Sequence, residues 1–240
     1  MEIKVVAVIQ ARVGSTRLPA KVLMEIDGKT ILERVYNRVA QAETLDDVIV
    51  ATTIKQNDDA IVDLCEMVNW HYYRGSEDDV LDRFYQCGAF YRADVIVRIT
   101  ADCPLIDPVL IDDVIAKFMS LYPDIDYASN TLPPRTYPRG VDVEVISRNA
   151  LEVQWETAVK WREHVTASLR KNTENYRVIA VTNDTDYSHM RWCVDTAKDL
   201  EFVRKVFGHF KEQPFGWMDV IGLLEEHPDW VIVDAQEDPK

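Results

Sequence analysis

Short apolar runs alternate with amphipathic helical segments through the first half of this 240-residue chain. The runs predict strands over residues 5–9, 47–52, 70–73 and 94–99. Helical spacing of apolar residues follows the first three runs, and Pro108 begins a further helix that extends through Met119. A helical crossover returns the chain so that the next strand runs in the same direction. We therefore predict a Rossmann-like, three-layer α/β/α fold with a mainly parallel sheet.

Capping residues indicate where several of these helices begin. Thr30 and Glu33 have the spacing of a capping box, and Asp107 precedes Pro108 as an N-cap. Asn57 and Ser76 are the predicted caps of the helices that follow the second and third strands.

The first predicted strand leads into an unusually basic loop, residues 10–21, with the sequence QARVGSTRLPAK. The loop combines a glycine, two hydroxyl side chains and three cations: Gly14, Ser15, Thr16, Arg12, Arg17 and Lys21. A glycine lets the backbone approach an anion, while hydroxyl and cationic groups bind its oxygens. The loop therefore predicts a site for a polyphosphate. It matches neither the GxxxxGK[ST] nor the GxGxxG pattern, which disfavours a P-loop kinase or a dinucleotide site.

Two aspartates follow predicted strands at distant points of the chain. Asp102 follows the strand at 94–99, and Asp195 ends a predicted return strand over 190–195. Because ligands of such sheets bind at the carboxyl ends of the strands, both carboxylates are expected near the basic loop. Together they are suited to Mg²⁺, which takes oxygen ligands and keeps substrate phosphates in its shell. The alternative for each aspartate is a role in turn or helix capping.

The alternation ends in a proline-rich segment at 131–140. After it we predict a half-exposed strand over 141–145, helical segments over about 148–170 and a strand over 176–181. We interpret about 130–185 as an insertion or subdomain within a single domain that spans 1–240. Helices over 197–207 and 217–226 and a short strand over 230–233 complete the prediction.

Composition limits the class of partner and the compartment. The net charge of −14 argues against nucleic acid as the main partner, although a local basic pocket for a nucleotide is compatible with it. The four cysteines show no metal-ligand spacing, and no apolar run approaches the roughly 20 residues of a membrane helix. We expect a soluble cytoplasmic protein with no membrane partner.

Five segments of the chain resemble the acylneuraminate and 3-deoxy-manno-octulosonate cytidylyltransferases, especially the spore coat polysaccharide biosynthesis protein F branch. The opening segment is similar to the pattern I-x-A-R-x-G-S-x-x-x-P-x-K. The others are RITADCPLIDP at 98–108, RGVDVEV at 139–145, REHVT at 162–166 and RWCVD at 191–195. The sequence departs from the family pattern at Ala20 and Ala101, where glycine is usual.

The resemblance implies a nucleotidyltransferase fold of the nucleotide-diphospho-sugar transferase type and a set of site residues. The implied nucleotide contacts are Ala11, Arg12, Gly14, Ser15, Arg17, Lys21, Thr100 and, against the ribose or base, Gly75 and Ser76. The implied catalytic residues are Arg12, Lys21 and Asp102, and the implied Mg²⁺ ligands are Asp102 and Asp195. The implied acceptor-side residues are Arg139, Asp142, Glu144, Arg162, Glu163 and His164. Trp155 and Trp161 are placed by the same resemblance at a homodimer contact.

The implied reaction transfers CMP from CTP to an acidic sugar or related acceptor and releases pyrophosphate, in the biosynthesis of a surface polysaccharide. Three alternatives stay open on the sequence. The first is a nucleotidylyltransferase for another NTP or a sugar 1-phosphate. The second is a glycosyltransferase of similar architecture, since Asp142-Val143-Glu144 is similar to an acidic metal motif. The third is a nucleotide-binding protein without catalysis.

Overall fold

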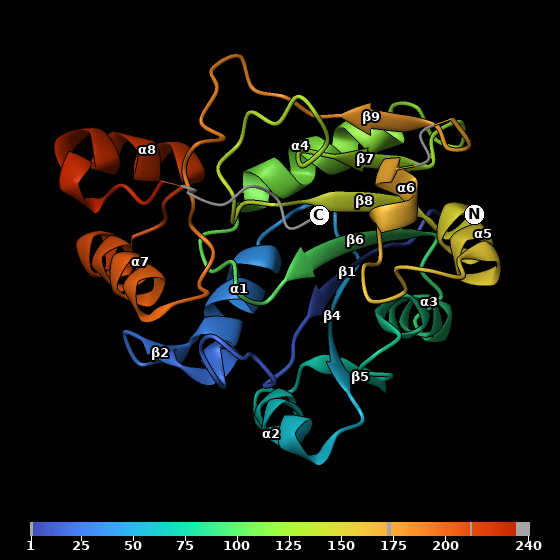
Figure 1. Ribbon diagram of the computed structural model, residues 1–240, viewed down its shortest axis with the longest axis horizontal. Helices are drawn as coiled ribbons and strands as arrows, with labels where there is room; N and C mark the ends of the chain where they lie inside the picture. The colour runs from blue at the N-terminus through green and yellow to red at the C-terminus, as the bar shows by residue number, and fades with distance from the viewer. Residues whose placement is uncertain (1, 172–173, 212, 234–240) are drawn as a thin grey trace.

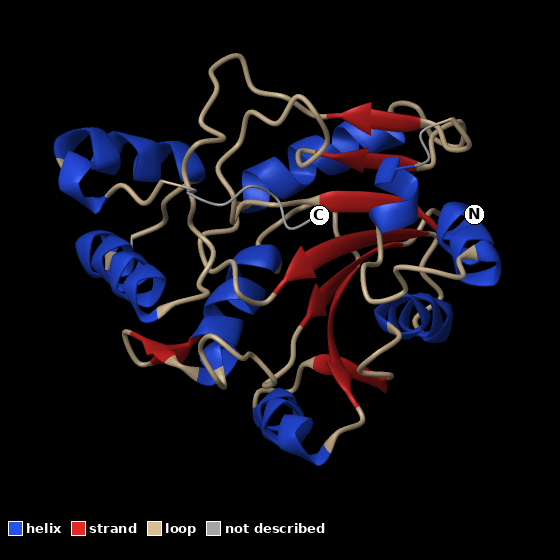
Figure 2. Ribbon diagram, in the orientation of Figure 1, coloured by secondary structure: helices blue, strands red, loops and turns tan. Residues whose placement is uncertain are grey.

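A seven-stranded sheet forms the centre of the molecule (Figures 1 and 2), with the strand order β5-β4-β1-β6-β8-β7-β9. The computed structural model describes residues 2–171, 174–211 and 213–233. The strands are β1 (Val5–Gln10), β4 (Asp47–Thr53), β5 (His71–Gly75), β6 (Val95–Thr100), β7 (Tyr127–Ser129), β8 (Glu144–Ser147) and β9 (Val178–Ala180). Only β8 runs against its neighbours, β6 and β7, so the predicted mainly parallel sheet is confirmed.

Helices cover both faces of this sheet, because successive side chains of its central strands point to opposite faces and are apolar on both. Val5, Ala7 and Ile9 of β1 face one core, whereas Val6 and Val8 face the other. The first core is covered by α1 (Ile31–Val39), α2 (Asp59–Met67), α4 (Pro108–Met119), α7 (Ala197–Phe210) and α8 (Trp217–Glu226). The second is covered by α3 (Val80–Phe90), α5 (Arg148–Thr157) and α6 (Ala167–Lys171), grouped at the right of Figure 1. The three-layer α/β/α prediction is confirmed.

Short elements complete the chain between these layers. They are the antiparallel hairpin of β2 (Glu25–Ile26) and β3 (Lys29–Thr30), and the 3₁₀ turns η1 (Lys21–Leu23), η2 (Gln56–Asp58) and η3 (Pro228–Trp230). No helix within the described ranges has both the length and the apolar character needed to cross a bilayer.

Two of the four predicted caps are confirmed and two are wrong. The Thr30–Glu33 capping box begins α1, and the carboxylate of Asp107 accepts the first amides of α4. The predicted cap Asn57 lies inside η2, and Asp58 is the residue that precedes α2. Asp79 caps α3 in place of Ser76, whose hydroxyl accepts a hydrogen bond from the amide of Asp79 at 2.9 Å. In both cases a turn inserted before the helix moved its start.

The second half departs further from the predicted strands. The predicted strand over 141–145 is displaced to β8, and Glu144 there is 3% exposed, so the half-exposed pattern is wrong. The predicted return strand over 190–195 is also wrong: this segment makes only isolated bridges, Arg139 with Arg191 and Met190 with Val233. Residues 230–233 hold the end of η3 and that bridge instead of a strand. Residues 130–185 contribute β8 and β9 to the main sheet.

Candidate active site

A cavity of about 310 Å³ lies where the carboxyl ends of β1 and β6 meet. Gln10, the last residue of β1, pairs with Thr100, the last residue of β6. The cavity is lined by Gln10, Arg12, Gly14, Ser15, Thr16, Arg17, Lys21, Val22, Thr100, Asp102 and Asp195. The structure therefore brings the basic loop, Asp102 and Asp195 together at one edge of the sheet, as their positions after predicted strands indicated. We call this space the β1 cavity.

The basic loop is fixed at its base by Asp58, which the sequence reasoning missed. One carboxylate oxygen of Asp58 accepts the amide of Val13 at 2.6 Å, and the other accepts the hydroxyl of Thr53. Asp58 is 3% exposed, so this carboxylate is a buried anchor. The available signal was an aspartate just before a predicted helix and just after a strand, where a carboxylate can bind loop amides.

The loop ends at Ala20, which has a φ of 55° and a ψ of 22°. This is the left-handed conformation, which glycine adopts without the steric cost that a Cβ brings. The glycine that is usual at this position in the resembling family therefore has a conformational explanation. Ala20 adopts the same turn, and Lys21 follows it as the first residue of η1.

Lys21 connects the two aspartates across the β1 cavity. Its ammonium group donates to Asp102 Oδ2 at 2.6 Å, to Asp195 Oδ1 at 2.8 Å and to the carbonyl of Val194 at 2.8 Å. Burial alone would lower the pKa of Lys21, but the charges and hydrogen bonds of the two carboxylates outweigh it and raise that pKa. All three protons of the ammonium thus have acceptors.

Asp102 is held in its ionised form by the same contact. Burial alone would raise its pKa, but the Lys21 ammonium, with hydrogen bonds from Lys21, Thr100 and Cys103, lowers it. The β1 cavity therefore contains a carboxylate at neutral pH.

Asp195 is held by two arginines from different segments. Its Oδ2 lies 3.0 Å from Arg17 of the basic loop and 2.7 Å from Arg191. Asp199, the third residue of α7, accepts the amides of Asp195 and Thr196 at 2.9 and 2.7 Å. The start of α7 thus fixes the backbone of Asp195 while Arg17 and Lys21 neutralise its side chain.

The donor set of the β1 cavity fits a hard divalent cation. Asp102 and Asp195 both lie within hydrogen-bond distance of one ammonium group, so their oxygens already converge on a single positive charge. Within the described residues, no group of three or more His, Cys, Asp and Glu side chains is placed to hold a metal ion. Two carboxylates that leave the remaining positions to phosphates and water suit Mg²⁺ better than a closed protein cage would.

A second cavity of about 280 Å³ shares Thr100 with the first. It is lined by Arg98, Thr100, Thr131, Pro133, Arg135, Arg139, Asp142, Glu144 and Arg170. We call it the arginine cavity, because four of these nine residues are arginines. The sequence reasoning named Arg139, Asp142 and Glu144 and missed the other three arginines. Arg98 begins the motif at 98–108, and a charged residue within an otherwise apolar strand was the available signal for a site residue.

Arg98 and Glu144 form an ion pair in the lining of this cavity, with the Glu144 carboxylate buried and the Arg98 side chain 20% exposed. Glu144 is 3% exposed and accepts hydrogen bonds from Arg98, from the Tyr127 hydroxyl at 2.6 Å and from the Thr166 hydroxyl at 2.7 Å. Arg98 also donates to Gln10 Oε1 at 3.0 Å, at the rim of the β1 cavity. Burial alone would raise the pKa of Glu144, but these partners outweigh it and lower that pKa.

Gly140 joins the two cavities through the backbone. It has a φ of +110°, and a Cβ there would lie 2.7 Å from the amide nitrogen of Cys193 and from the carbonyl carbon of Trp192. Arg139, the residue before it, forms two backbone hydrogen bonds with this segment. Its amide donates to the carbonyl of Met190 at 2.9 Å, and its carbonyl accepts the amide of Trp192 at 2.6 Å. Only glycine fits this crossing.

The remaining predicted residues lie outside both cavities. Ala11 is buried at 1% exposure, and Gly75 packs so closely on α3 that a Cβ would lie 2.7 Å from Arg83 Cγ. Ser76 lies at the turn before α3, where its hydroxyl accepts the amide of Asp79. Their assignment to the nucleotide stays a prediction.

On the acceptor side, Arg162 bonds Asp79 and the carbonyls of Trp155 and Ala158, and the side chain of His164 is 68% exposed beside Glu163. The structure does not bring Arg162, Glu163 or His164 to the arginine cavity.

Comparisons with known proteins agree with this geometry. The sequence model of the family described as cytidylyltransferase matches residues 6–220. The spore coat polysaccharide biosynthesis protein SpsF of Bacillus subtilis is 32% identical over 92% of this chain and 94% of its own. A cytidylyltransferase structure from Leptospira borgpetersenii superposes with a TM-score of 0.91 at 30% identity, covering both chains fully.

A CMP:2-keto-3-deoxy-manno-octonic acid synthetase complexed with CTP superposes with a TM-score of 0.65 over 86% of this chain and 99% of its own. At 22% identity it shows the shared fold alone. The family match and the SpsF relative go further, since each spans most of the chain. The chain therefore belongs to the cytidylyltransferase family, in the branch that resembles SpsF, and is a CTP-dependent nucleotidyltransferase.

Proposed function

We propose that this protein transfers CMP from CTP to an acidic sugar or related acceptor, releasing pyrophosphate, in the biosynthesis of a surface polysaccharide. The observation that carries the proposal is the pair of cavities that meet at Thr100. The β1 cavity places cations at the carboxyl end of β1, where a triphosphate would bind. The arginine cavity presents guanidinium groups beside it. The named biosynthetic role of SpsF and the CTP bound in the synthetase structure support the same reaction.

The residues of the β1 cavity have separate tasks in this reaction. Arg12 and Arg17 have side chains 50% and 54% exposed, so they can turn from their carboxylate partners to the phosphates of an entering nucleotide. Lys21 would neutralise charge at the α-phosphate, where an acceptor oxygen forms the new P–O bond. The bond to the β-phosphate breaks, and the electron pair leaves with pyrophosphate. The protein contributes positioning and charge stabilisation, as is usual in phosphoryl-type transfer.

Asp102 and Asp195 are the residues that would hold Mg²⁺. When bound, the ion would supply Lewis-acid neutralisation of phosphate oxygens. Asp102 is ionised and available for this role at neutral pH, because its pKa is lowered.

The arginine cavity is the proposed acceptor site. Arg135 is paired with Asp142, and Arg98 with Glu144, which leaves the cavity richer in guanidinium groups than in carboxylates. An acceptor that carries a carboxylate suits such a lining, because arginine forks bind carboxylates with two parallel hydrogen bonds. Arg139 and Arg170 complete the proposed acceptor contacts.

The test is pyrophosphate release from CTP, Mg²⁺ and a panel of acidic sugars, with UTP, GTP, ATP and sugar 1-phosphates as parallel substrates. We expect release with CTP and at least one acid, and none without an acceptor. Release with another NTP or a sugar 1-phosphate would reassign the substrate. Turnover of nucleotide sugars without pyrophosphate would indicate a glycosyltransferase, and binding without any turnover would refute catalysis.

We further propose a cytoplasmic homodimer that uses the segment of about 130–185 as its contact. Val153, Val159 and Trp161 are 40%, 91% and 42% exposed, which is unusual for apolar side chains so close together in the chain. Trp155 is less suited to this role, because its ring stacks on Tyr85 at 4.3 Å. Sedimentation equilibrium of the wild type and of Val159→Asp tests the contact, and a monomeric wild type would refute it.

A further inference from the structure

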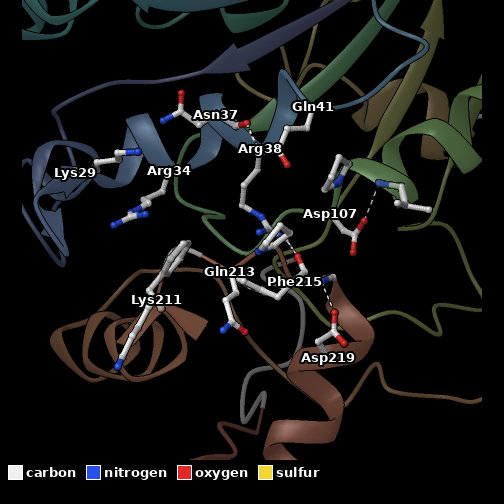
Figure 3. A pocket seen from close by; sticks show the side chains of 15 residues that line it. Lys29, Arg34, Asn37, Arg38, Gln41, Asp107, Lys211, Gln213, Phe215 and Asp219 are labelled. Atoms are coloured by element: carbon white, nitrogen blue, oxygen red, sulfur yellow. Dashed lines mark hydrogen bonds between the residues drawn. The ribbon is translucent and has the colours of Figure 1, made fainter. Parts of the chain in front are cut away.

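A third cavity, of about 460 Å³, lies apart from the two described above and shares no lining residue with them (Figure 3). Its walls come from α1, the start of α4, the end of α7 and the loop that leads into α8. Its lining includes the cations Lys29, Arg34, Arg38 and Lys211 and the carboxylates of Asp107 and Asp219. Neither the family resemblance nor the proposed reaction uses this space.

Two buried arginines on α1 dominate the cavity. Arg34 and Arg38 are 7% and 8% exposed and lie four residues apart, so they share one face of the helix. Figure 3 shows Arg38 extending from α1 toward Phe215, whereas Arg34 extends from the same helix on the side of Lys29. Buried arginines normally have a carboxylate partner, since an isolated charge is costly to bury.

Each guanidinium is anchored through Nε and Nη2. Arg34 donates through both to the carbonyl of Ile26 at 3.0 and 2.9 Å, and through Nη2 also to the carbonyl of Asp27 at 2.9 Å. Arg38 donates through Nε and Nη2 to the carbonyls of Ile106 and Phe215. Among the described residues, no hydrogen bond uses Nη1 of either side chain. A purely structural role explains the hydrogen bonds of Nε and Nη2. It does not explain the Nη1 groups, which remain as donors for a ligand.

Aromatic rings hold the planes of both groups. The guanidinium carbon of Arg34 lies 4.7 Å from the ring centre of Phe207, and that of Arg38 lies 4.3 Å from the ring centre of Phe215. Stacking and carbonyl hydrogen bonds together fix the direction of the Nη1 edges before any ligand arrives. Preorganised donors of this kind bind with little loss of side-chain freedom.

The positive charge of the cavity is partly balanced by the carboxylates of Asp107 and Asp219 in its lining. The charge of Asp107 acts on Arg38, but no carboxylate of the described residues lies within ion-pair distance of Arg34 or Arg38. Asp107 already accepts the amides of Val109, Leu110 and Trp217, and Asp219 accepts the amide of Gly216. Burial lowers the pKa of Arg38 to about 10, which still leaves it protonated at neutral pH. Lys29 and Lys211 add two further cations, in a chain whose net charge is −14.

We propose that this cavity is a binding site for a small multivalent oxyanion, a metabolite that bears phosphate groups or several carboxylates, held by the Nη1 groups of Arg34 and Arg38. The site is independent of the proposed cytidylyl transfer. Its volume exceeds that of the β1 cavity, so a molecule larger than a single phosphate fits.

The test is calorimetric titration of the full-length protein with pyrophosphate and, separately, with citrate. Pyrophosphate also suits the β1 cavity, so we expect two classes of site, one weakened by Arg12→Ala and the other by Gln41→Glu. Gln41 is exposed, lies three residues after Arg38 and lines the cavity, so Gln41→Glu places a carboxylate there without removing an anchoring group. We expect about three- to tenfold weaker binding at that class, because the new carboxylate repels the oxyanion from the rim of the cavity.

Asn149→Asp is the matched control, because it makes the same amide-to-carboxylate change at an exposed position of α5, outside the cavity. Arg38→Met is the direct variant, and thermal melting reports whether it folds. If Gln41→Glu weakens the binding of pyrophosphate alone, the site takes phosphate ligands. If it also weakens the binding of citrate, the site takes polycarboxylates as well. A single class of pyrophosphate site lost in Arg12→Ala, or equal effects of Gln41→Glu and Asn149→Asp, would overturn the proposal.

Discussion

The β1 cavity and the arginine cavity share Thr100, but they hold their charges differently. In the β1 cavity the loop arginines Arg12 and Arg17 are half exposed and touch single carboxylates at 3.9 and 3.0 Å. In the arginine cavity the carboxylate of Glu144 is buried and accepts three different side chains. The comparison suggests that the first set of charges is arranged to exchange partners, whereas the second is built to stay fixed.

The largest expected effect is on the fixed pair. Glu144→Ala removes the buried acceptor of Arg98 and of the Tyr127 and Thr166 hydroxyls, and we expect the free energy of unfolding to fall by about 3–5 kcal/mol. Chemical denaturation measures this loss. Glu225→Ala, at an exposed position of α8, is the control and should change stability by less than about 0.5 kcal/mol. Equal effects of the two substitutions would show that Glu144 is not a fixed element.

Lys21→Ala tests the β1 cavity at its buried cation. We expect kcat/KM for pyrophosphate release to fall by about 10²–10³, because one charge-stabilising donor at the reacting phosphate is lost. Stability should change less than in Glu144→Ala, since Asp195 keeps Arg17 and Arg191 as partners and the Asp102 side chain is 27% exposed. Lys117→Ala on the exposed side of α4 is the matched control. Unchanged catalysis in Lys21→Ala would remove this residue from the mechanism.

Asp102→Asn sharpens the comparison through pH. The folded-state pKa of Asp102 is lowered, so its contribution is present above the ordinary value of 3.8 and is lost as the pH falls through the lowered one. The pKa of Lys21 is raised, so its contribution is present below 10.5 and is lost as the pH rises through the raised value. The stability difference between wild type and variant, about 1–3 kcal/mol, should stay constant from about pH 5 to pH 9. A difference that varies within this range would contradict the ion pair.

The smallest effect is expected at Ala20. Ala20→Gly relieves the left-handed strain of a φ of 55° but gives more freedom to the unfolded chain. We expect stability to change by less than about 1 kcal/mol, with catalysis preserved. Thermal melting checks this, and a large loss would mean that the Ala20 methyl packs in a way that its conformation does not indicate.

The sequence predicted the β1 cavity better than the arginine cavity, for a physical reason. Lys21 and Asp102 follow the parallel strands β1 and β6, which bring such positions to one edge. Asp195 reaches the same edge from an irregular segment, where the amide of Val194 donates to the carbonyl of Asp102 at 2.8 Å. Arg98 and Arg135 reach the arginine cavity from a strand face and an irregular loop, and local pattern does not report which way such side chains point. The return strand over 190–195 was wrong because two isolated backbone bridges, at Met190 and Arg191, take the place of a ladder.

The third cavity could not be predicted from sequence patterns. Arg34 and Arg38 occupy positions of an amphipathic helix where a solvated face is the ordinary interpretation. The burial of Arg38 depends on Phe215, and that of Arg34 on Phe207, both from the far end of the chain. Such a contact depends on tertiary structure, which residue spacing does not encode.

The backbone crossing at Gly140 has a kinetic consequence for a two-substrate enzyme. Arg139 lines the arginine cavity, and it is bridged to Arg191, which holds Asp195 at 2.7 Å in the β1 cavity. Because Gly140 leaves no free space against Trp192 and Cys193, a backbone shift on one side must displace the other. Occupancy of one cavity should therefore change the affinity of the other, and initial-rate patterns should show substrate synergism rather than independent addition.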